Sequence, residues 1–138
     1  MNIGFTRTET NSKFITIICH NPYKNFPHNF NHLIELSDEV VLADGGANSY
    51  LKYMKTYQKA PSPAFLTGDM DSIKKSTLQF FEANNTPILN DPNQDTNDLE
   101  KALSKTKAHI IDKHAQQTDT KFSILIWGLA GHRYDQLL

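Results

Sequence analysis

Two aspartates lie two positions apart directly after an apolar segment of the chain. The motif GDMDS (68–72) follows the residues at 64–67, which have the character of a short buried strand. Residues i and i+2 of an extended segment point the same way, so Asp69 and Asp71 can direct two carboxylates at one point. A divalent cation would offset their repulsion, and oxygen ligands without neighbouring Cys or His suit Mg²⁺. The alternative is that Asp71 and Ser72 cap the helix expected after them.

A second acidic motif, NQDTNDLEKAL (93–103), opens the most clearly periodic helix of the sequence. Asp95 suits the N-cap and Asp98 suits the first turn, because both positions face the positive end of the helix dipole. A first-turn aspartate can also face a cleft, so capping and ligand binding both stay open. Lys101 follows Asp98 by three positions, where a surface ion pair contributes only about 0.2–0.5 kcal/mol.

Two further motifs combine glycines with polar residues. DGGANS (44–49) places two glycines between an expected strand and an expected helix, where backbone N–H groups can approach a phosphate closely. GLAGHRYDQ (128–136) adds Arg133, whose guanidinium suits bidentate phosphate contact, and Asp135. The alternatives are a tight turn for the first motif and an Arg133–Asp135 pair in an ordinary loop for the second.

Strands and helices alternate along the chain. Apolar, strand-like segments lie at 14–19, 39–43, 64–67, 87–89 and 121–127, and helical segments at 28–38, 48–57, 74–85 and 94–114. This order indicates a parallel α/β sheet with helices on both faces, a Rossmann-like arrangement. In the last helix one apolar stripe is predicted, formed by Leu99, Ala102, Leu103, Thr106, Ile110 and Ile111. Ligands of such sheets bind at the carboxyl ends of the strands, and the four motifs follow four of the five strands.

Composition excludes several classes of function. The 138 residues predict one domain at 14–138 after a polar leader at 1–13. With a net charge of -1, the chain has no basic field for a nucleic acid, and no apolar segment approaches the roughly 18 residues of a membrane span. The one cysteine, Cys19, favours a reducing, cytoplasmic compartment. His28 and His32 lack a third zinc ligand nearby and are expected on the surface.

The four motifs, in this order, resemble those of the thiamine pyrophosphokinase family. The resemblance is carried by ADGGAN (43–48), TGDMDSI (67–73), NQDTNDLEKAL and GLAGHRYDQ, within residues 14–138. The family transfers a pyrophosphoryl group from ATP to the hydroxyl of thiamine, which gives thiamine diphosphate and AMP. The resemblance therefore implies Mg²⁺ as cofactor, ATP and thiamine as partners, and a homodimer for the full-length protein.

The resemblance also implies roles for individual residues. Asp69, Asp71 and Asp98 would hold Mg²⁺, while Asp71, Asp98 and Arg133 would take part in catalysis. A carboxylate, Asp71 or Asp98, would accept the hydroxyl proton. The nucleotide cleft would be lined by Asp44, Gly45, Gly46, Asn48, Gln94, Asp95, Lys101 and Asp135.

The family also has a C-terminal β-rich domain that supplies much of the thiamine pocket. The resemblance implies that this chain carries the ATP and metal part, is incomplete at its C-terminus, and stops at Leu137-Leu138, where a helix should begin. Two alternatives stay open. A metal-dependent nucleotide-sugar transferase also uses a D-x-D motif, but it would not explain the two motifs at 93–103 and 128–136. A nucleotide-binding regulatory module would share the fold.

Overall fold

A computed structural model describes residues 12–20, 28–57, 59–68, 72–90, 98–113, 120–128 and 136–137. The strands are β1 (Ser12–Ile18), β2 (Glu39–Ala43), β3 (Phe65–Gly68), β4 (Ile88–Asn90), β5 (Lys121–Trp127) and β6 (Gln136–Leu137). The helices are α1 (His28–Leu36), α2 (Gly46–Thr56), α3 (Lys75–Ala83) and α4 (Asp98–Lys113). None of these described helices is both long enough and apolar enough to cross a bilayer.

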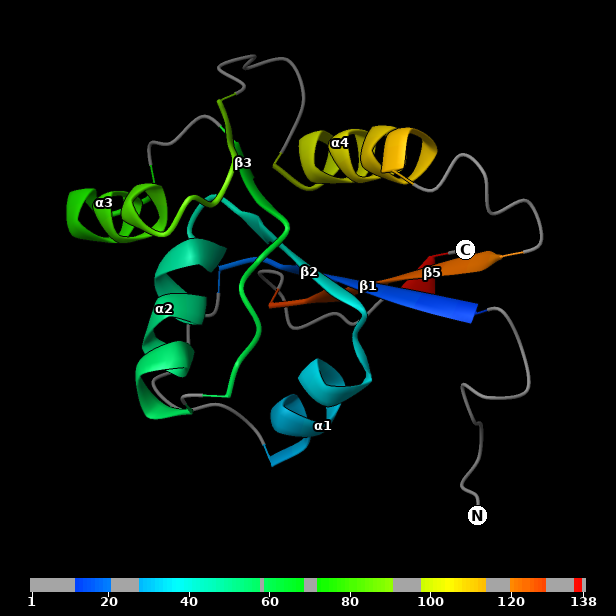
Figure 1. The fold of residues 1–138 in the computed structure, drawn as a ribbon, viewed down its shortest axis with the longest axis horizontal. Helices are drawn as coiled ribbons and strands as arrows, with labels where there is room; N and C mark the ends of the chain where they lie inside the picture. Colours follow the sequence, from blue (N-terminus) through cyan, green and yellow to red (C-terminus); the bar gives the residue numbers. More distant parts are fainter. Residues whose placement is uncertain are drawn as a thin grey trace.

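The strands form one sheet in the order β4-β3-β2-β1-β5-β6 (Figure 1). All pairs from β4 to β5 are parallel, which confirms the predicted α/β class. The short β6 pairs antiparallel with β5, Leu137 opposite Ile124. The helix expected to begin at Leu137 is therefore wrong, because this residue uses its backbone groups to extend the sheet instead.

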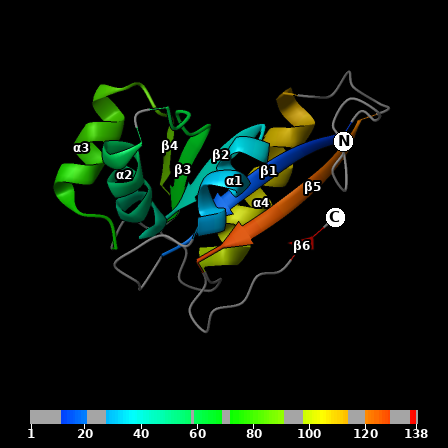
Figure 2. The same cartoon turned by 90° about the horizontal axis from the view of Figure 1, so that it is seen from below.

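Helices cover both faces of the sheet, as Figure 2 shows in the view from below. The first face is covered by α1, α2 and α3, and its core is rich in aromatic side chains, among them Phe30, Tyr50, Phe81 and Trp127. The second face is covered by α4, and its core is mostly aliphatic, with Ala102 packed over the central strands. Because both faces are buried, β1 and β2 are continuous apolar segments rather than alternating ones.

The predicted apolar stripe of α4 faces the sheet at five of its six positions. Ala102 and Thr106 are fully buried as expected, but the side chain of Ile111 is 70% exposed. Lys101, expected at the surface, is only 3% exposed. Leu99, Leu103 and Ile110 also pack against this core, so the predicted stripe faces the sheet except at Ile111, and Lys101 is buried beside it.

Candidate functional site

The carboxyl ends of β3, β2, β1 and β5 lie next to one another at one edge of the sheet. Backbone bonds continue past the strand ends, from Asp44 N–H to Thr67 O (2.9 Å) and from Cys19 N–H to Trp127 O (2.8 Å). The chain winds from β1 to β4 in one direction and then crosses to β5 on the other side of β1. Open α/β sheets bind ligands outside the carboxyl ends of the strands, at such a reversal of strand order.

At this edge the Asp44 carboxylate lies directly against Gly68. Asp44 is 2% exposed and has a positive φ of 44°, an uncommon backbone conformation that Asp tolerates better than most residues. Gly68 has φ 132°, and a Cβ built there would be 2.0 Å from Asp44 Oδ1. Only glycine therefore fits before Asp69, and a buried carboxylate stands beside the start of the segment 69–71.

The other glycines at this edge are explained by close packing. A Cβ on Gly46 would lie 1.9 Å from the carbonyl oxygen of Ile18, so no side chain fits where α2 meets the end of β1. A Cβ on Gly128, at φ 92°, would lie 2.6 Å from Cys19 O. Gly45 is less constrained, with φ -59° and only the His20 side chain nearby, at 3.2 Å. Close backbone packing thus explains Gly46, the first residue of α2, and Gly128.

The Asn48 side chain joins two of the motifs. Its Nδ2 donates to Ser72 O (2.8 Å), and its Oδ1 accepts from Lys74 N–H (3.0 Å). The N-cap residue of α3 is Lys74, whose side chain makes no capping bond. The alternative that Ser72 caps α3 is therefore wrong, because the N-cap lies two residues later at Lys74 and its N–H is bound by Asn48 of another helix.

Lys101 lies in the first turn of α4, on the side that packs against β2 and β3. Lys101 is only 3% exposed, so it is not the surface ion-pair partner that its spacing from Asp98 allowed. A lysine is almost never fully buried unless it is paired. The carboxyl ends of β2 and β3 carry Asp44 and Gly68. The helix thus brings a buried cation and the backbone of Asp98 onto the two strands that end in acidic motifs.

Comparison with known proteins decides the family. The family model described as "Thiamin pyrophosphokinase, catalytic domain" matches residues 30–138. The chain belongs to the thiamin pyrophosphokinase catalytic-domain family.

Curated relatives include "Thiamine pyrophosphokinase 2" of Oryza sativa subsp. japonica and of Arabidopsis thaliana. Each is 30% identical over 105 residues, covering 69% of this chain and 38% of the relative. The chain thus spans well under half the length of these thiamine pyrophosphokinases.

Solved structures of the same family share the fold. Thiamin pyrophosphokinase from Candida albicans has a TM-score of 0.64 at 24% identity, over 75% of this chain and 34% of that one. The yeast enzyme has a TM-score of 0.60 at 24% identity, over 79% of this chain and 35% of that one. The α/β fold predicted from the alternation of strands and helices is confirmed.

Most of the site residues that the family resemblance singled out lie outside the described residues. These are Asp69, Asp71, Gln94, Asp95, Arg133 and Asp135, together with the side chain of Asp98. Within the described part of the chain, no three His, Cys, Asp or Glu side chains come together in a way that could hold a metal ion. The predicted magnesium site therefore stays a prediction.

His20 is a residue at this edge of the pyrophosphokinase domain that the sequence interpretation missed. It follows β1 at the reversal of strand order, is exposed, and packs its ring beside Gly45. The sequence signal for His20 is its position directly after a continuous apolar strand. His32, expected on the surface, is exposed.

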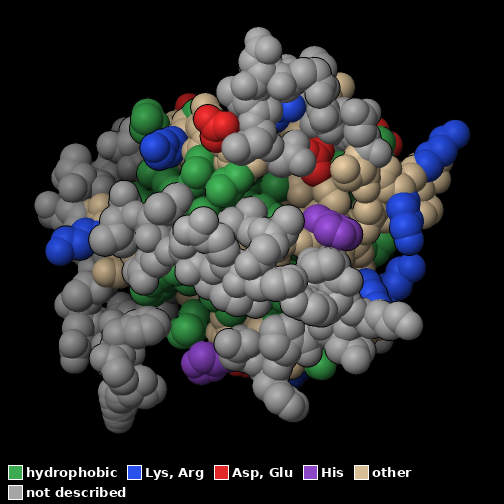
Figure 3. Space-filling view, turned by 180° about the vertical axis from the view of Figure 1, so that it is seen from behind, with side chains coloured by type: hydrophobic (Ala, Val, Ile, Leu, Met, Phe, Trp, Pro, Cys, Tyr) green, Lys and Arg blue, Asp and Glu red, His purple; other side chains and the backbone are tan. Residues whose placement is uncertain are grey.

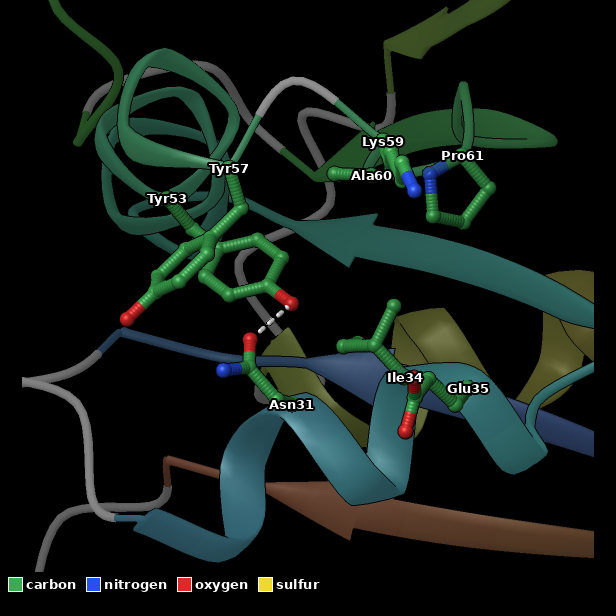
Figure 4. A pocket seen from close by; sticks show the side chains of 8 residues that line it. All are labelled: Asn31, Ile34, Glu35, Tyr53, Tyr57, Lys59, Ala60 and Pro61. Atoms are coloured by element: carbon green, nitrogen blue, oxygen red, sulfur yellow. Dashed lines mark hydrogen bonds between the residues drawn. The ribbon is translucent and has the colours of Figure 1, made fainter.

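A separate cavity of about 260 Å³ lies between α1, the end of α2 and the connection into β3 (Figure 4). Tyr53 and Tyr57 line it, and Tyr53 Oη donates to Asn31 Oδ1. Burial, then Tyr57 and Glu35, raise the pKa of Tyr53, so its phenol stays neutral near pH 7. The cavity opens near the amino end of β3, away from the edge where the family motifs gather.

The charges of the described surface are mixed. Figure 3 shows Lys or Arg side chains together with Asp or Glu side chains on one face of the molecule. This agrees with the net charge of -1.

Proposed function

We propose that this protein provides the catalytic domain of a thiamine pyrophosphokinase, which transfers pyrophosphate from ATP to thiamine in a Mg²⁺-dependent reaction. The observation that carries the proposal is the family match over residues 30–138 combined with the fold, which gathers the ends of the motif-bearing strands at one edge. Because the chain spans only 38% of its curated relatives, a full-length protein would supply the rest of the thiamine site.

The donor set suits a hard divalent cation. Asp69 and Asp71 are separated by one residue and follow Gly68, which is held against the buried Asp44 carboxylate. Asp98 begins α4, which packs on the strands that carry the other acids. Mg²⁺ prefers carboxylate oxygens and substrate phosphates, and when bound it would neutralise charge on the transferring group. In this proposal Asp69, Asp71 and Asp98 hold the ion.

The remaining residues would bind, orient and move a proton. The hydroxyl oxygen of thiamine attacks the β-phosphorus of ATP, the bond from that phosphorus to the bridging oxygen of the α-phosphate breaks, and AMP leaves. The hydroxyl proton passes to a carboxylate of Asp71 or Asp98. Lys101 and Arg133 would place positive charge near the phosphates, and such positioning and charge stabilisation supply most of the catalysis in phosphoryl transfer.

Release of AMP from ATP and Mg²⁺ that depends on thiamine tests the proposal in the full-length protein. Asp69→Asn and Asp71→Asn should each lower the rate about a hundredfold or more while leaving the unfolding temperature unchanged. Asp112→Asn, at an exposed position near the end of α4, is the matched control and should keep full activity.

The same assay separates the alternatives. ATP binding without AMP release would favour a nucleotide-binding regulatory module. Sugar transfer from a nucleotide-sugar would favour the transferase alternative. AMP release without thiamine would count against the proposed acceptor.

We also propose a cytoplasmic protein that forms a homodimer at full length. Cys19 is the one cysteine of the sequence and is buried, which is compatible with a reducing compartment. Analytical ultracentrifugation of the full-length protein tests the dimer, and a single monomeric species at micromolar concentration would exclude it.

A further inference from the structure

We infer that Asn48 is a positioning residue for the magnesium-binding segment and does not contact the nucleotide. This inference rests on the proposed function. It concerns how the α2 motif acts on the GDMDS motif, which lies more than twenty positions later in the chain.

Both polar groups of the Asn48 side chain are engaged by one short segment. Ser72 offers a carbonyl oxygen, which can only accept, and Lys74 offers a backbone N–H, which can only donate. These partners fix which side-chain atom is nitrogen and which is oxygen. The Asn48 amide thereby uses one of its two N–H donors and one of its two oxygen lone pairs to hold this neighbouring segment.

The segment before Ser72 is held from the same motif. A Cβ built on Gly68 would lie only 2.0 Å from Asp44 Oδ1, so Gly68 is packed tightly against this carboxylate. After Ser72, the side chain of Ile73 is 9% exposed and belongs to the aromatic core. Both neighbours of the stretch 69–71 are therefore fastened to the loop and first turn at 44–48, with only three residues between them.

Asn48 also replaces a local cap. The side chain of the α3 N-cap residue, Lys74, forms no capping bond, and Asn48 accepts the N–H of Lys74 from outside the helix. In a capping box the same N–H is bound by a residue of its own helix. Here the N–H is bound by Asn48 of α2. This bond couples the start of α3, just after the GDMDS motif, to the first turn of α2.

The test compares Asn48→Ala with Asn84→Ala in the full-length protein. Asn84 is the matched control, because its Nδ2 also donates to a backbone carbonyl, that of Phe80, at the other end of α3 (2.7 Å). Two readouts need no turnover: amide hydrogen exchange at Lys74, and Mg²⁺ affinity by calorimetry with α,β-methylene-ATP present.

Asn48→Ala should speed exchange at Lys74 about fivefold to tenfold and weaken Mg²⁺ binding about tenfold, since one hydrogen bond typically changes an equilibrium by such a factor. Affinity for the nucleotide analogue in EDTA should stay unchanged. Asn84→Ala should change neither Mg²⁺ affinity nor Lys74 exchange. If Asn48→Ala does not fold, Asn48→Asp keeps the acceptor for Lys74 and loses the donor to Ser72, and it should weaken Mg²⁺ binding about threefold.

Unchanged Mg²⁺ affinity in Asn48→Ala or in Asn48→Asp would overturn the inference. Weaker analogue binding in EDTA would overturn it too, because that result indicates direct nucleotide contact. Asp69→Asn and Asp71→Asn separate this failure from failure of the proposed function. If those two variants weaken Mg²⁺ binding and Asn48→Ala does not, only the positioning role is lost.

Discussion

The two faces of the sheet satisfy their buried polar groups differently. On the face under α1, α2 and α3, the Tyr50 hydroxyl donates to Pro61 O (2.7 Å). On the same face Thr16 Oγ1 lies 2.6 Å from Ser37 Oγ, which itself donates to Leu33 O. On the face under α4, the buried hydroxyls of Thr67 and Thr106 have no hydrogen-bond partner within the described residues.

The core under α1, α2 and α3 therefore serves stability, whereas the core under α4 adjoins the proposed site. Buried hydroxyls are nearly always bonded, so an exception calls for a physical reason. Thr67 shares its face with Phe65, precedes Gly68, and lies under the helix that buries Lys101. The face that retains unbonded polar groups is thus the one whose helix carries Asp98 and Lys101 to the carboxyl edge.

The largest expected effect of a core substitution is on the aromatic face. Phe30 is 1% exposed and its ring centroid lies 4.7 Å from that of Tyr53 and 4.4 Å from that of Trp127. Phe30→Ala should lower the free energy of unfolding by about 3–5 kcal/mol, measured by urea denaturation, because a large cavity is left. Phe122→Ala, at a half-buried position of the α4 face, is the control and should cost about 1–2 kcal/mol. Equal losses would mean that the two cores contribute alike.

The aromatic face should also contribute less to the free energy of unfolding at alkaline pH. Burial, and secondarily Tyr53, raise the pKa of Tyr50 far above its usual value near 10. The folded state then holds a proton that the unfolded state releases, so the stability from Tyr50 is complete below about pH 10 and falls as the pH rises further. By pH 11 the wild type should have lost about 1.4 kcal/mol through this residue.

The Tyr50→Phe variant isolates the contribution of the Tyr50 hydroxyl to stability. At pH 8 the variant should be about 1 kcal/mol less stable than the wild type, because it lacks the bond to Pro61. By pH 11 the difference should have disappeared, since phenylalanine does not titrate. Urea denaturation at both pH values measures the two differences, and a constant difference would show that Tyr50 titrates normally.

The smallest expected effect compares two threonines of opposite faces. Thr16→Val removes a bonded hydroxyl and should lower the free energy of unfolding by about 1 kcal/mol. Thr67→Val removes a hydroxyl that has no hydrogen-bond partner in the described part of the chain, and it should raise the free energy of unfolding by about 1 kcal/mol. Thermal denaturation of both variants is the measurement. Destabilisation by Thr67→Val would show that this hydroxyl is bonded and that the contrast between the faces is wrong.

The parts of the fold that sequence predicted are those with local causes. β2 and β5 have the predicted bounds, because continuous apolar segments flanked by polar ones have one plausible place in a two-sided sheet. α2 begins two residues before position 48, the start predicted from a sequence pattern that places both glycines between the strand and the helix. Gly45 in fact adopts helical φ and ψ, and Gly46 is required by its contact with Ile18.

The parts that sequence did not predict have distant causes. The bonds from Asn48 to Ser72 and Lys74 join segments more than twenty positions apart, and no local pattern marks them. The burial of Lys101 depends on how the first turn of α4 packs against β2 and β3, and the apolar stripe of the helix does not indicate that packing. The glycines and acids after the strands did predict where the proposed site lies, because a parallel sheet brings those ends together whatever the loops do.

The pairing of β1 with β5 has a consequence during synthesis. All seven residues of β1, Ser12 to Ile18, pair with β5, yet almost the whole described chain is made between the two strands. Until β5 leaves the ribosome, the nascent sheet exposes an apolar strand with an unpaired backbone edge, the kind of surface that promotes aggregation. We expect a chaperone to bind the exposed β1 of the nascent chain until Trp127 has emerged from the ribosome.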